Sequence, residues 1–311
     1  MIRIFSDPVC LEHRGPPGYP ECPERLAAIL DHLDPGWRHG GRGAPEGVEE
    51  AVAAVHDAAY LRRFERAVAR GDLLLDSADN PLAAGSWRAA WAAAATAVAA
   101  LDWSCGGSGR RAFAVVRPPG HHAERDRAMG FCFLNNAAVM AERARRHHGV
   151  GRVAIVDFDV HHGNGTQHAF EERDDVLYVS LHQYPFYPGT GARDEKGRGR
   201  GAGYTLNLPL PAGSGDAAYR TAFEESVLPA VRAFVPELLL LSAGFDAWRG
   251  DPLGGMRVSV EGFTEWSSLL AELAAEVTGG RLVSLLEGGY DVAALPTLAA
   301  AHVKGLTVAG V

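Results

Sequence analysis

The chain alternates between short apolar runs and longer segments with a helical pattern of apolar and polar positions. The apolar runs have the length of buried strands and lie at residues 2–5, 112–116, 152–158, 176–181, 204–208, 238–242 and 281–286. The helical patterns lie between many of them, at residues 23–33, 50–70, 83–100, 133–148, 216–234, 260–277 and 292–304. This alternation predicts an α/β fold in which a central, mostly parallel sheet is covered by helices on both faces.

Polar side chains follow five of the predicted strands, at the point where each strand ends. The segments concerned are Arg117-Pro-Pro-Gly-His-His122, Asp157-Phe-Asp-Val-His-His-Gly-Asn-Gly165, Ser180-Leu-His182, Ser242-Ala-Gly-Phe-Asp246 and Glu287-Gly-Gly-Tyr290. In sheets of this kind, ligands bind beyond the carboxyl ends of the strands. The sequence therefore predicts that His, Asp, Ser and Tyr side chains from distant segments meet at one functional edge of the sheet.

The run that begins at Asp157 carries two carboxylates and two imidazoles. Residues 157, 159 and 161 share one side of the chain while it stays extended. Carboxylate oxygen and imidazole nitrogen are both good ligands for a divalent metal, so we favour a metal site over a solvated turn for Asp159 and His161. Asp246 would supply the third ligand that a catalytic metal site with an open position needs.

Two further groups indicate acid–base chemistry. His121 and His122 follow a rigid Pro-Pro-Gly turn, which favours an acid–base pair over exposed polar surface. Asp157 could hydrogen-bond one ring and Asn164 the other; a carboxylate raises the proton affinity of an imidazole, whereas an amide orients it without adding charge. Tyr290 is either a structural tyrosine or a hydroxyl donor aimed at a developing oxyanion.

Length, charge and cysteine content narrow the class of protein. The 311 residues contain no internal repeat or low-complexity linker, so one large domain is expected. The formal net charge of −8 and the lack of a basic stripe argue against a nucleic-acid partner. No run is long enough to span a membrane, and the first residues are too short an apolar run for a signal peptide, so we expect a cytoplasmic protein without a membrane partner. The cysteines show no C-x-x-C spacing and form no disulfide framework; they are Cys10, Cys22, Cys105 and Cys132.

Taken together, the motifs resemble those of the histone deacetylase superfamily, specifically its class II-like bacterial members, which include acetylpolyamine amidohydrolases. The matching segments cover nearly the whole chain and are Pro23–Leu26, Arg117–His122, Gly130–Asn136, Asp157–His168, Tyr178–His182, Tyr187–Gly191, Ser242–Asp246 and Glu287–Tyr290. Asn164 stands where class I members carry Asp, which matches the class II side. Tyr290 is retained where some poorly active relatives have His.

The resemblance implies an arginase/deacetylase-like fold, a single catalytic domain over residues 1–311 and zinc-dependent removal of an acetyl or other acyl group from acetyl-lysine or an acetylpolyamine. Zinc, with Fe²⁺ as the alternative metal, would be held by Asp159, His161 and Asp246. The tandem acid–base pair would be His121, near Asp157, and His122, near Asn164. Tyr290 would polarise the substrate carbonyl.

The resemblance also implies a substrate tunnel and bound potassium. The residues that would line the tunnel are Gly130, Phe131, Tyr187 and Gly288. A structural potassium ion would be bound at Asp157, Asp159, His161, Ser180 and Leu181. A second monovalent site would involve Phe170, Arg173, Val176 and Tyr204.

Two other functions remain open, an arginase-like binuclear ureohydrolase and a non-catalytic acyl-amine binder. The first needs a second carboxylate near Asp246, where the sequence offers only one; the second would not need His121, His122 and Tyr290. The sequence does not distinguish acetyl-lysine protein, acetylpolyamine or another acylated metabolite as substrate, and it does not define the oligomeric state. Segments 10–22, 76–82 and 183–203 are expected to shape the tunnel mouth.

Overall fold

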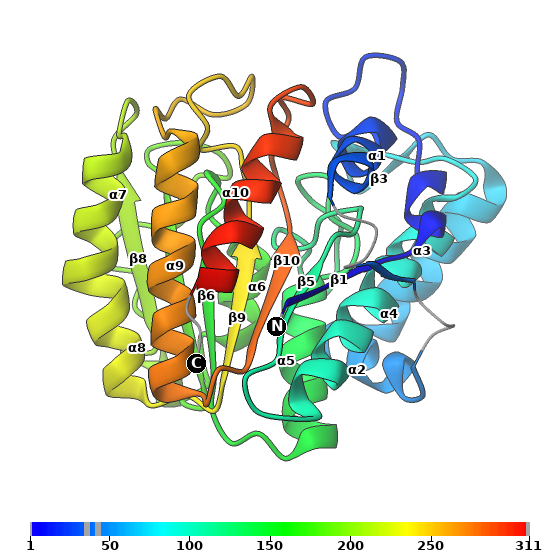
Figure 1. Ribbon diagram of the computed structural model, residues 1–311. Helices are drawn as coiled ribbons and strands as arrows, with labels where there is room; N and C mark the ends of the chain where they lie inside the picture. Colours follow the sequence, from blue (N-terminus) through cyan, green and yellow to red (C-terminus); the bar gives the residue numbers. More distant parts are fainter. Residues whose placement is uncertain (1, 34–37, 41–44, 309–311) are drawn as a thin grey trace.

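The computed structural model describes residues 2–33, 38–40 and 45–308 (Figure 1). Its centre is an eight-stranded, wholly parallel sheet with the strand order β2-β1-β5-β10-β9-β6-β7-β8. The strands are β1 (Ile2–Ser6), β2 (Arg38–Gly40), β5 (Arg111–Ala114), β6 (Val153–Asp157), β7 (Val176–Gln183), β8 (Thr205–Leu210), β9 (Leu238–Ala243) and β10 (Leu282–Leu286). The predicted α/β fold with a mostly parallel sheet is confirmed. The short strand β2 and a separate hairpin of β3 (Leu74–Leu75) and β4 (Ser77–Pro81) were not predicted.

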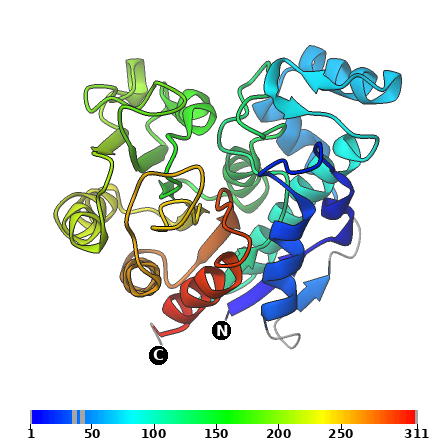
Figure 2. The same ribbon diagram turned by 90° about the horizontal axis from the view of Figure 1, so that it is seen from above.

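Helices cover both faces of the sheet (Figures 1 and 2). On one face lie α1 (Pro23–His32), α7 (Asp216–Ala222), α8 (Leu228–Phe234), α9 (Val260–Val277) and α10 (Leu295–Val308). On the other lie α2 (Val48–Val55), α4 (Ser86–Cys105) and α5 (Asn136–His148), with α3 (Ala58–Arg70) packed beside α4. The short helix α6 (Asn164–Phe170) connects β6 to β7. Within the described part of the chain, no helix has the length and apolar character needed to cross a bilayer.

The helix predicted over residues 50–70 is interrupted at His56 and Asp57. The ring of His56 is buried, with Nδ1 hydrogen-bonded to the carbonyl of Glu124 and Nε2 accepting from the backbone N–H of Asn135. The backbone N–H of Asp57 donates to the carbonyl of Arg125 instead of continuing the helix. Hydrogen bonds from a distant loop therefore override the local helical pattern here.

The register of the central strands sets the position of the site. Asp157, the last residue of β6, is paired with Ser180 of β7 and with Ser242 of β9. All three side chains are fully buried. The loops that leave these strands, and the loops after β5 and β10, therefore emerge side by side at one edge, as the sequence predicts.

Candidate metal centre and active site

Asp159, His161 and Asp246 form a buried cluster with metal-site geometry. The first two lie in the loop after β6 and the third lies in the loop after β9. Each residue offers one potential ligand atom, and these three atoms all lie within 4.8 Å of one another. Nδ1 of His161 lies 3.1 Å from Oδ1 of Asp159 and 3.1 Å from Oδ2 of Asp246. Ligands held about 2.0–2.1 Å from a tetrahedral ion stand roughly 3.3 Å apart, so the spacing fits a common ion.

The electrostatics of this cluster also fit a cation. Burial, and then the negative charge of Asp159, raise the pKa of Asp246 to about 7. Two adjacent buried carboxylates are costly unless a positive charge lies between them. His161 lines an open cavity, which leaves one side of the cluster accessible. These residues therefore fit a divalent metal with an open coordination position.

Close backbone contacts hold the carboxylates in place. The backbone N–H groups of Val160 and Gly288 donate to Oδ1 of Asp246 and Oδ2 of Asp159, each at 2.8 Å. A Cβ atom at Gly288 would collide with both carboxylates, so this close approach requires glycine. Gly288 thus supports the cluster and is not among the residues that line the cavity.

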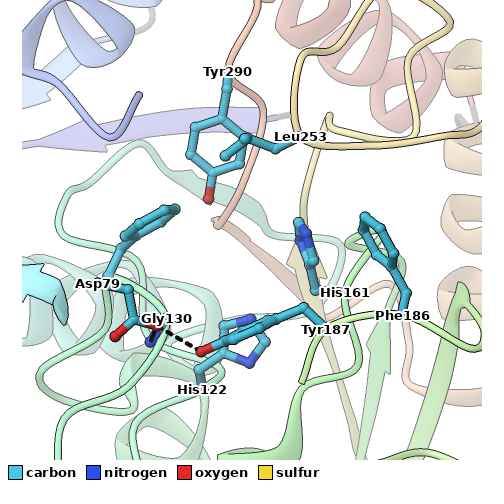
Figure 3. Close-up of a pocket in the computed structure, with 9 residues that line it drawn as sticks. Asp79, His122, Gly130, His161, Phe186, Tyr187, Leu253 and Tyr290 are labelled. Carbon is cyan, nitrogen blue, oxygen red and sulfur yellow. Dashed lines mark hydrogen bonds between the residues drawn. The ribbon is translucent and has the colours of Figure 1, made fainter. Parts of the chain in front are cut away.

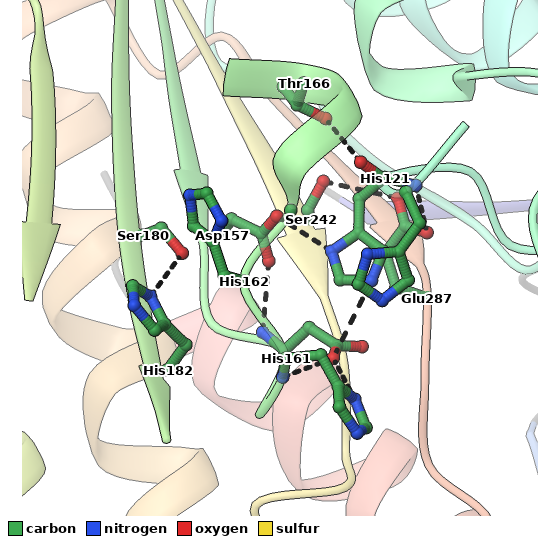
Figure 4. Close-up of polar contacts among 12 residues, drawn as sticks. His121, Asp157, His161, His162, Thr166, Ser180, His182, Ser242 and Glu287 are labelled. Atoms are coloured by element: carbon green, nitrogen blue, oxygen red, sulfur yellow. Dashed lines mark hydrogen bonds and ion pairs between the residues drawn. The ribbon is translucent and has the colours of Figure 1, made fainter. Parts of the chain in front are cut away.

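His121 and His122 lie next to the cluster, with ring centroids 4.0 Å apart. Nδ1 of His121 is 3.0 Å from Oδ2 of Asp157, and Nδ1 of His122 is 2.7 Å from Oδ1 of Asn164 (Figure 4 shows the His121 pair). Both hydrogen bonds were predicted from the sequence. Oδ2 of Asp157 also accepts from the hydroxyl of Tyr178 at 3.0 Å, a partner that the sequence analysis did not identify.

The two imidazoles differ in proton affinity. Burial lowers the pKa of His121, but the charges of Asp159 and Asp157 outweigh it and raise the pKa to about 10. Burial and the neighbouring His121 and His161 hold the pKa of His122 well below its ordinary value. A cation bound by Asp159 would weaken the rise that Asp159 causes in the pKa of His121, but the carboxylate of Asp157 would remain beside the ring. Of the two imidazoles, His121 therefore has the higher proton affinity and His122 the lower.

A cavity of about 280 Å³ opens onto this centre (Figure 3). Its lining residues are Asp79, His122, Gly130, Phe131, His161, Phe186, Tyr187, Leu253 and Tyr290. Gly130, Phe131 and Tyr187 were predicted tunnel residues. Asp79 and Phe186 lie in segments expected to shape the mouth, whereas Leu253 stands in a loop that gave no signal. The carboxylate of Asp79 accepts from the hydroxyl of Tyr187 at 2.8 Å and from the backbone N–H of Gly130 at 3.1 Å.

The hydroxyl of Tyr290 points toward the space that His122 and His161 border (Figure 3). Burial raises the pKa of Tyr290 well above its ordinary value, against the opposing charge of Arg25. The guanidinium carbon of Arg25 lies 4.7 Å from the centroid of the ring. Tyr290 therefore stays protonated and can donate a hydrogen bond into the cavity.

The remaining predicted residues lie away from the cavity. His162 is buried with both ring nitrogens in contact with side chains, Thr190 at 2.8 Å and Gln167 at 2.9 Å, so neither nitrogen is free for a metal. Of the residues predicted to bind potassium, Ser180 and Leu181 are buried at the end of β7 beside Asp157. The other four predicted residues lie near the opposite end of β7. Phe170 and Arg173 precede this strand, Val176 is its first residue, and Tyr204 immediately precedes β8. Their roles remain predictions.

The chain is similar to known proteins along nearly its whole length. A histone deacetylase domain model matches residues 19–306. A histone deacetylase-like amidohydrolase of Pseudomonas aeruginosa is 40% identical over 325 residues, which cover 98% of this chain and 85% of that protein.

Two solved structures are also similar over 98% of this chain. The HDA15 HD domain has a TM-score of 0.89 at 38% identity, with 87% of that chain covered. An acetylpolyamine aminohydrolase from Burkholderia pseudomallei has a TM-score of 0.87 at 34% identity, with 99% of that chain covered. With a family model and these relatives matched along nearly its whole length, the chain belongs to the histone deacetylase family.

Proposed function

We propose that the protein is a zinc-dependent deacetylase that hydrolyses the amide bond of an acetylated primary amine. The observation that carries this proposal is the convergence of three elements on one cavity. These are the Asp159–His161–Asp246 cluster, the His121–His122 pair and the hydroxyl of Tyr290.

Each element has a defined task in amide hydrolysis. A bound divalent metal would polarise the substrate carbonyl and lower the pKa of a water molecule. Tyr290 donates a hydrogen bond to the carbonyl oxygen as negative charge develops there. His122, neutral and exposed to the cavity, takes the proton from the attacking water and returns it to the departing amine. His121, charged beside Asp157, stabilises the developing negative charge without leaving its buried position.

The cavity walls support an amine with an aliphatic stem. Phe131, Phe186, Leu253 and the ring of Tyr187 supply apolar surface around the passage. Among the described residues that line the cavity, Asp79 is the one with a carboxylate, and it suits an N–H group or a cation on the distal part of the substrate. Acetyl-lysine peptides and acetylpolyamines both have this form, and we propose that the substrate belongs to one of these two classes.

We also propose zinc as the metal, with Fe²⁺ as the alternative, and a structural potassium ion at Asp157, Ser180 and Leu181. Two carboxylates and one imidazole are ligands that zinc accepts in catalytic sites. Oδ1 of Asp157 accepts from the backbone N–H of Asp159 at 3.2 Å, and Ser180 is paired with Asp157 in the sheet. Both residues are buried and carry oxygen atoms, the ligands that suit a hard monovalent cation.

A binuclear ureohydrolase is less well supported. Among the described residues only one cluster of three metal-ligating side chains is present. Asp157, the nearest additional carboxylate in sequence, is instead engaged by His121 and Tyr178.

The test is acetate release by the zinc-loaded protein from an acetyl-lysine peptide, acetylputrescine and acetylspermidine, with metal content measured on the same sample. We expect one zinc per chain and turnover of at least one substrate, abolished by chelation. No release from any of the three at full metal content would overturn the proposal. Two metals per chain with urea release from a guanidinium substrate would establish the ureohydrolase instead.

A further inference from the structure

The side-chain amide of Asn164 is held on both sides by buried groups. Its Oδ1 lies 2.7 Å from Nδ1 of His122. Its Nδ2 donates to Oε1 of Glu124 at 2.6 Å and to the backbone carbonyl of His122 at 3.3 Å. Asn164 and Glu124 are both buried. The hydrogen-bond chain therefore runs from His122 through Asn164 to Glu124.

The acceptors around Nδ2 fix the orientation of this amide. A carboxylate and a carbonyl oxygen only accept hydrogen bonds, so a reversed amide would place Oδ1 of Asn164 against two acceptors. With Oδ1 facing His122, Nδ1 of that ring must carry the hydrogen. The lone pair of the neutral ring is then on Nε2, the nitrogen on the opposite side from Asn164.

Glu124 has a partner of its own. Nδ1 of His168 lies 2.9 Å and 3.0 Å from the two carboxylate oxygens. The hydrogen bond to Glu124 raises the pKa of His168, and this histidine in turn helps to lower the pKa of Glu124 against the effect of burial. Both residues line a second cavity whose lining residues include none of those around the substrate cavity. Changes at Glu124 and His168 therefore leave the walls of the substrate cavity intact.

We propose that Glu124 is a positioning residue that selects, through Asn164, the Nδ1-protonated tautomer of His122, and that His168 holds Glu124 in place. The intervening amide separates the charge of Glu124 from His122, so the ring is oriented without the direct carboxylate contact that His121 has. The catalytic consequence rests on the proposed function, in which Nε2 of His122 accepts a proton. The tautomer itself does not depend on it.

The experiment is a long-range ¹H–¹⁵N correlation spectrum of zinc-loaded protein labelled with ¹⁵N at histidine. Comparison with His122→Gln assigns the His122 ring. We expect the Nδ1–H tautomer in the wild type. Glu124→Gln offers Asn164 either a donor or an acceptor. Glu124→Leu leaves only the 3.3 Å contact with the carbonyl of His122 to orient the amide, so both variants should show a mixture that includes Nε2–H.

The matched control is Glu142→Gln. Glu142 lines the same second cavity but contacts Arg146 and Arg173 rather than Asn164. This variant should keep the wild-type tautomer. His168→Gln changes a partly exposed side chain and should shift the tautomer in the same direction, which keeps the test available if the buried Glu124 variants fold poorly.

Kinetics provide the second measurement. We expect kcat in Glu124→Leu to fall in proportion to the fraction of His122 in the Nε2–H tautomer, about twofold for an equal mixture, with KM and zinc content unchanged, because that fraction presents no lone pair to the cavity. A spectrum with only Nδ1–H in Glu124→Gln, Glu124→Leu and His168→Gln overturns the inference whatever the activity. A shifted tautomer with unchanged kcat would instead contradict the role of His122 in the proposed function.

Discussion

The guanidinium of Arg117 and the carboxylate of Glu21 form two parallel hydrogen bonds of 2.7 Å, and both side chains are fully buried. Burial alone would raise the pKa of Glu21, but Arg117, together with Arg25, lowers it to about 2. Arg25 also donates to the carbonyls of Glu287 and Gly289, each at 2.6 Å. The network therefore ties the loop that precedes the histidine pair to the loop that carries Tyr290.

Glu21→Gln should lower the free energy of unfolding by about 3–5 kcal/mol, because it leaves buried guanidinium charge without its partner. Urea denaturation at pH 7 measures the loss. Glu12→Gln is the matched control, since the Glu12–Arg88 pair is partly exposed and worth about 0–1 kcal/mol. The stabilisation by Glu21 is present above pH 4.5, the ordinary pKa of its carboxyl group. It is lost as the pH falls toward 2, the pKa of this group in the folded protein. Equal losses in the two variants would contradict the structural importance of the buried pair.

Tyr290→Phe should reduce kcat about 100- to 1000-fold, the usual effect of removing one well-placed oxyanion donor. Zinc content should remain that of the wild type, because Tyr290 is not in the ligand cluster. Tyr184→Phe, outside the residues that line the cavity, should retain activity. Steady-state kinetics on the best substrate checks both variants, and near-wild-type turnover in Tyr290→Phe would refute the role of its hydroxyl.

Asp246→Asn should abolish zinc binding and, with it, the response of the protein to chelators. A metal that binds only the folded state stabilises it by about 4 kcal/mol when its concentration is 1,000 times the dissociation constant. EDTA should therefore lower the Tm of the wild type but not that of Asp246→Asn. Full zinc occupancy in the variant, measured by elemental analysis, would refute the ligand assignment.

Strands buried on both faces were predictable because their sequences are almost continuously apolar, as in Leu238–Leu241 of β9. The three-residue strand β2 contains Arg and His and exists through its pairing with β1, so no local pattern indicates it. In the same way, the boundary between α2 and α3 depends on hydrogen bonds to residues 124, 125 and 135, which sequence periodicity cannot reveal.

The candidate site also contains residues that a local motif reveals and residues that only contacts between distant segments reveal. The positions of Asp159 and His161 in the cluster were predictable because two candidate ligands stand two residues apart in one motif. Glu124 was missed although it follows the histidine pair closely, because its importance depends on the distance to Asn164, 40 residues along the chain. Leu253 was missed because a single apolar residue in a loop becomes significant only when the loops after β7 and β9 meet around the cavity.

His302 offers a prediction about acid stability that is independent of the active site. Its ring is fully buried, with Nδ1 2.7 Å from the hydroxyl of Ser267 and Nε2 2.8 Å from the hydroxyl of Ser284. Burial lowers its pKa from 6.5 to about 3. Above pH 6.5 the ring is neutral in both the folded and the unfolded state, so in that range it adds no pH dependence to the free energy of unfolding.

As the pH falls from 6.5 toward 3, the unfolded chain binds a proton at His302 that the folded protein does not, so folded stability is lost across this window. At about 1.4 kcal/mol per pH unit, lowering the pH from 6.5 to 4.5 should cost the wild type roughly 2–3 kcal/mol through this residue. His302→Gln should lack that part of the loss, although its stability at neutral pH will be lower.

Urea midpoints at the two pH values, measured with EDTA so that metal release does not contribute, give the difference. The other buried histidines with lowered pKa are present in both proteins and cancel; they are His13, His56, His122, His162 and His182. An equal acid loss in wild type and variant would show that His302 is protonated in the folded state at pH 4.5.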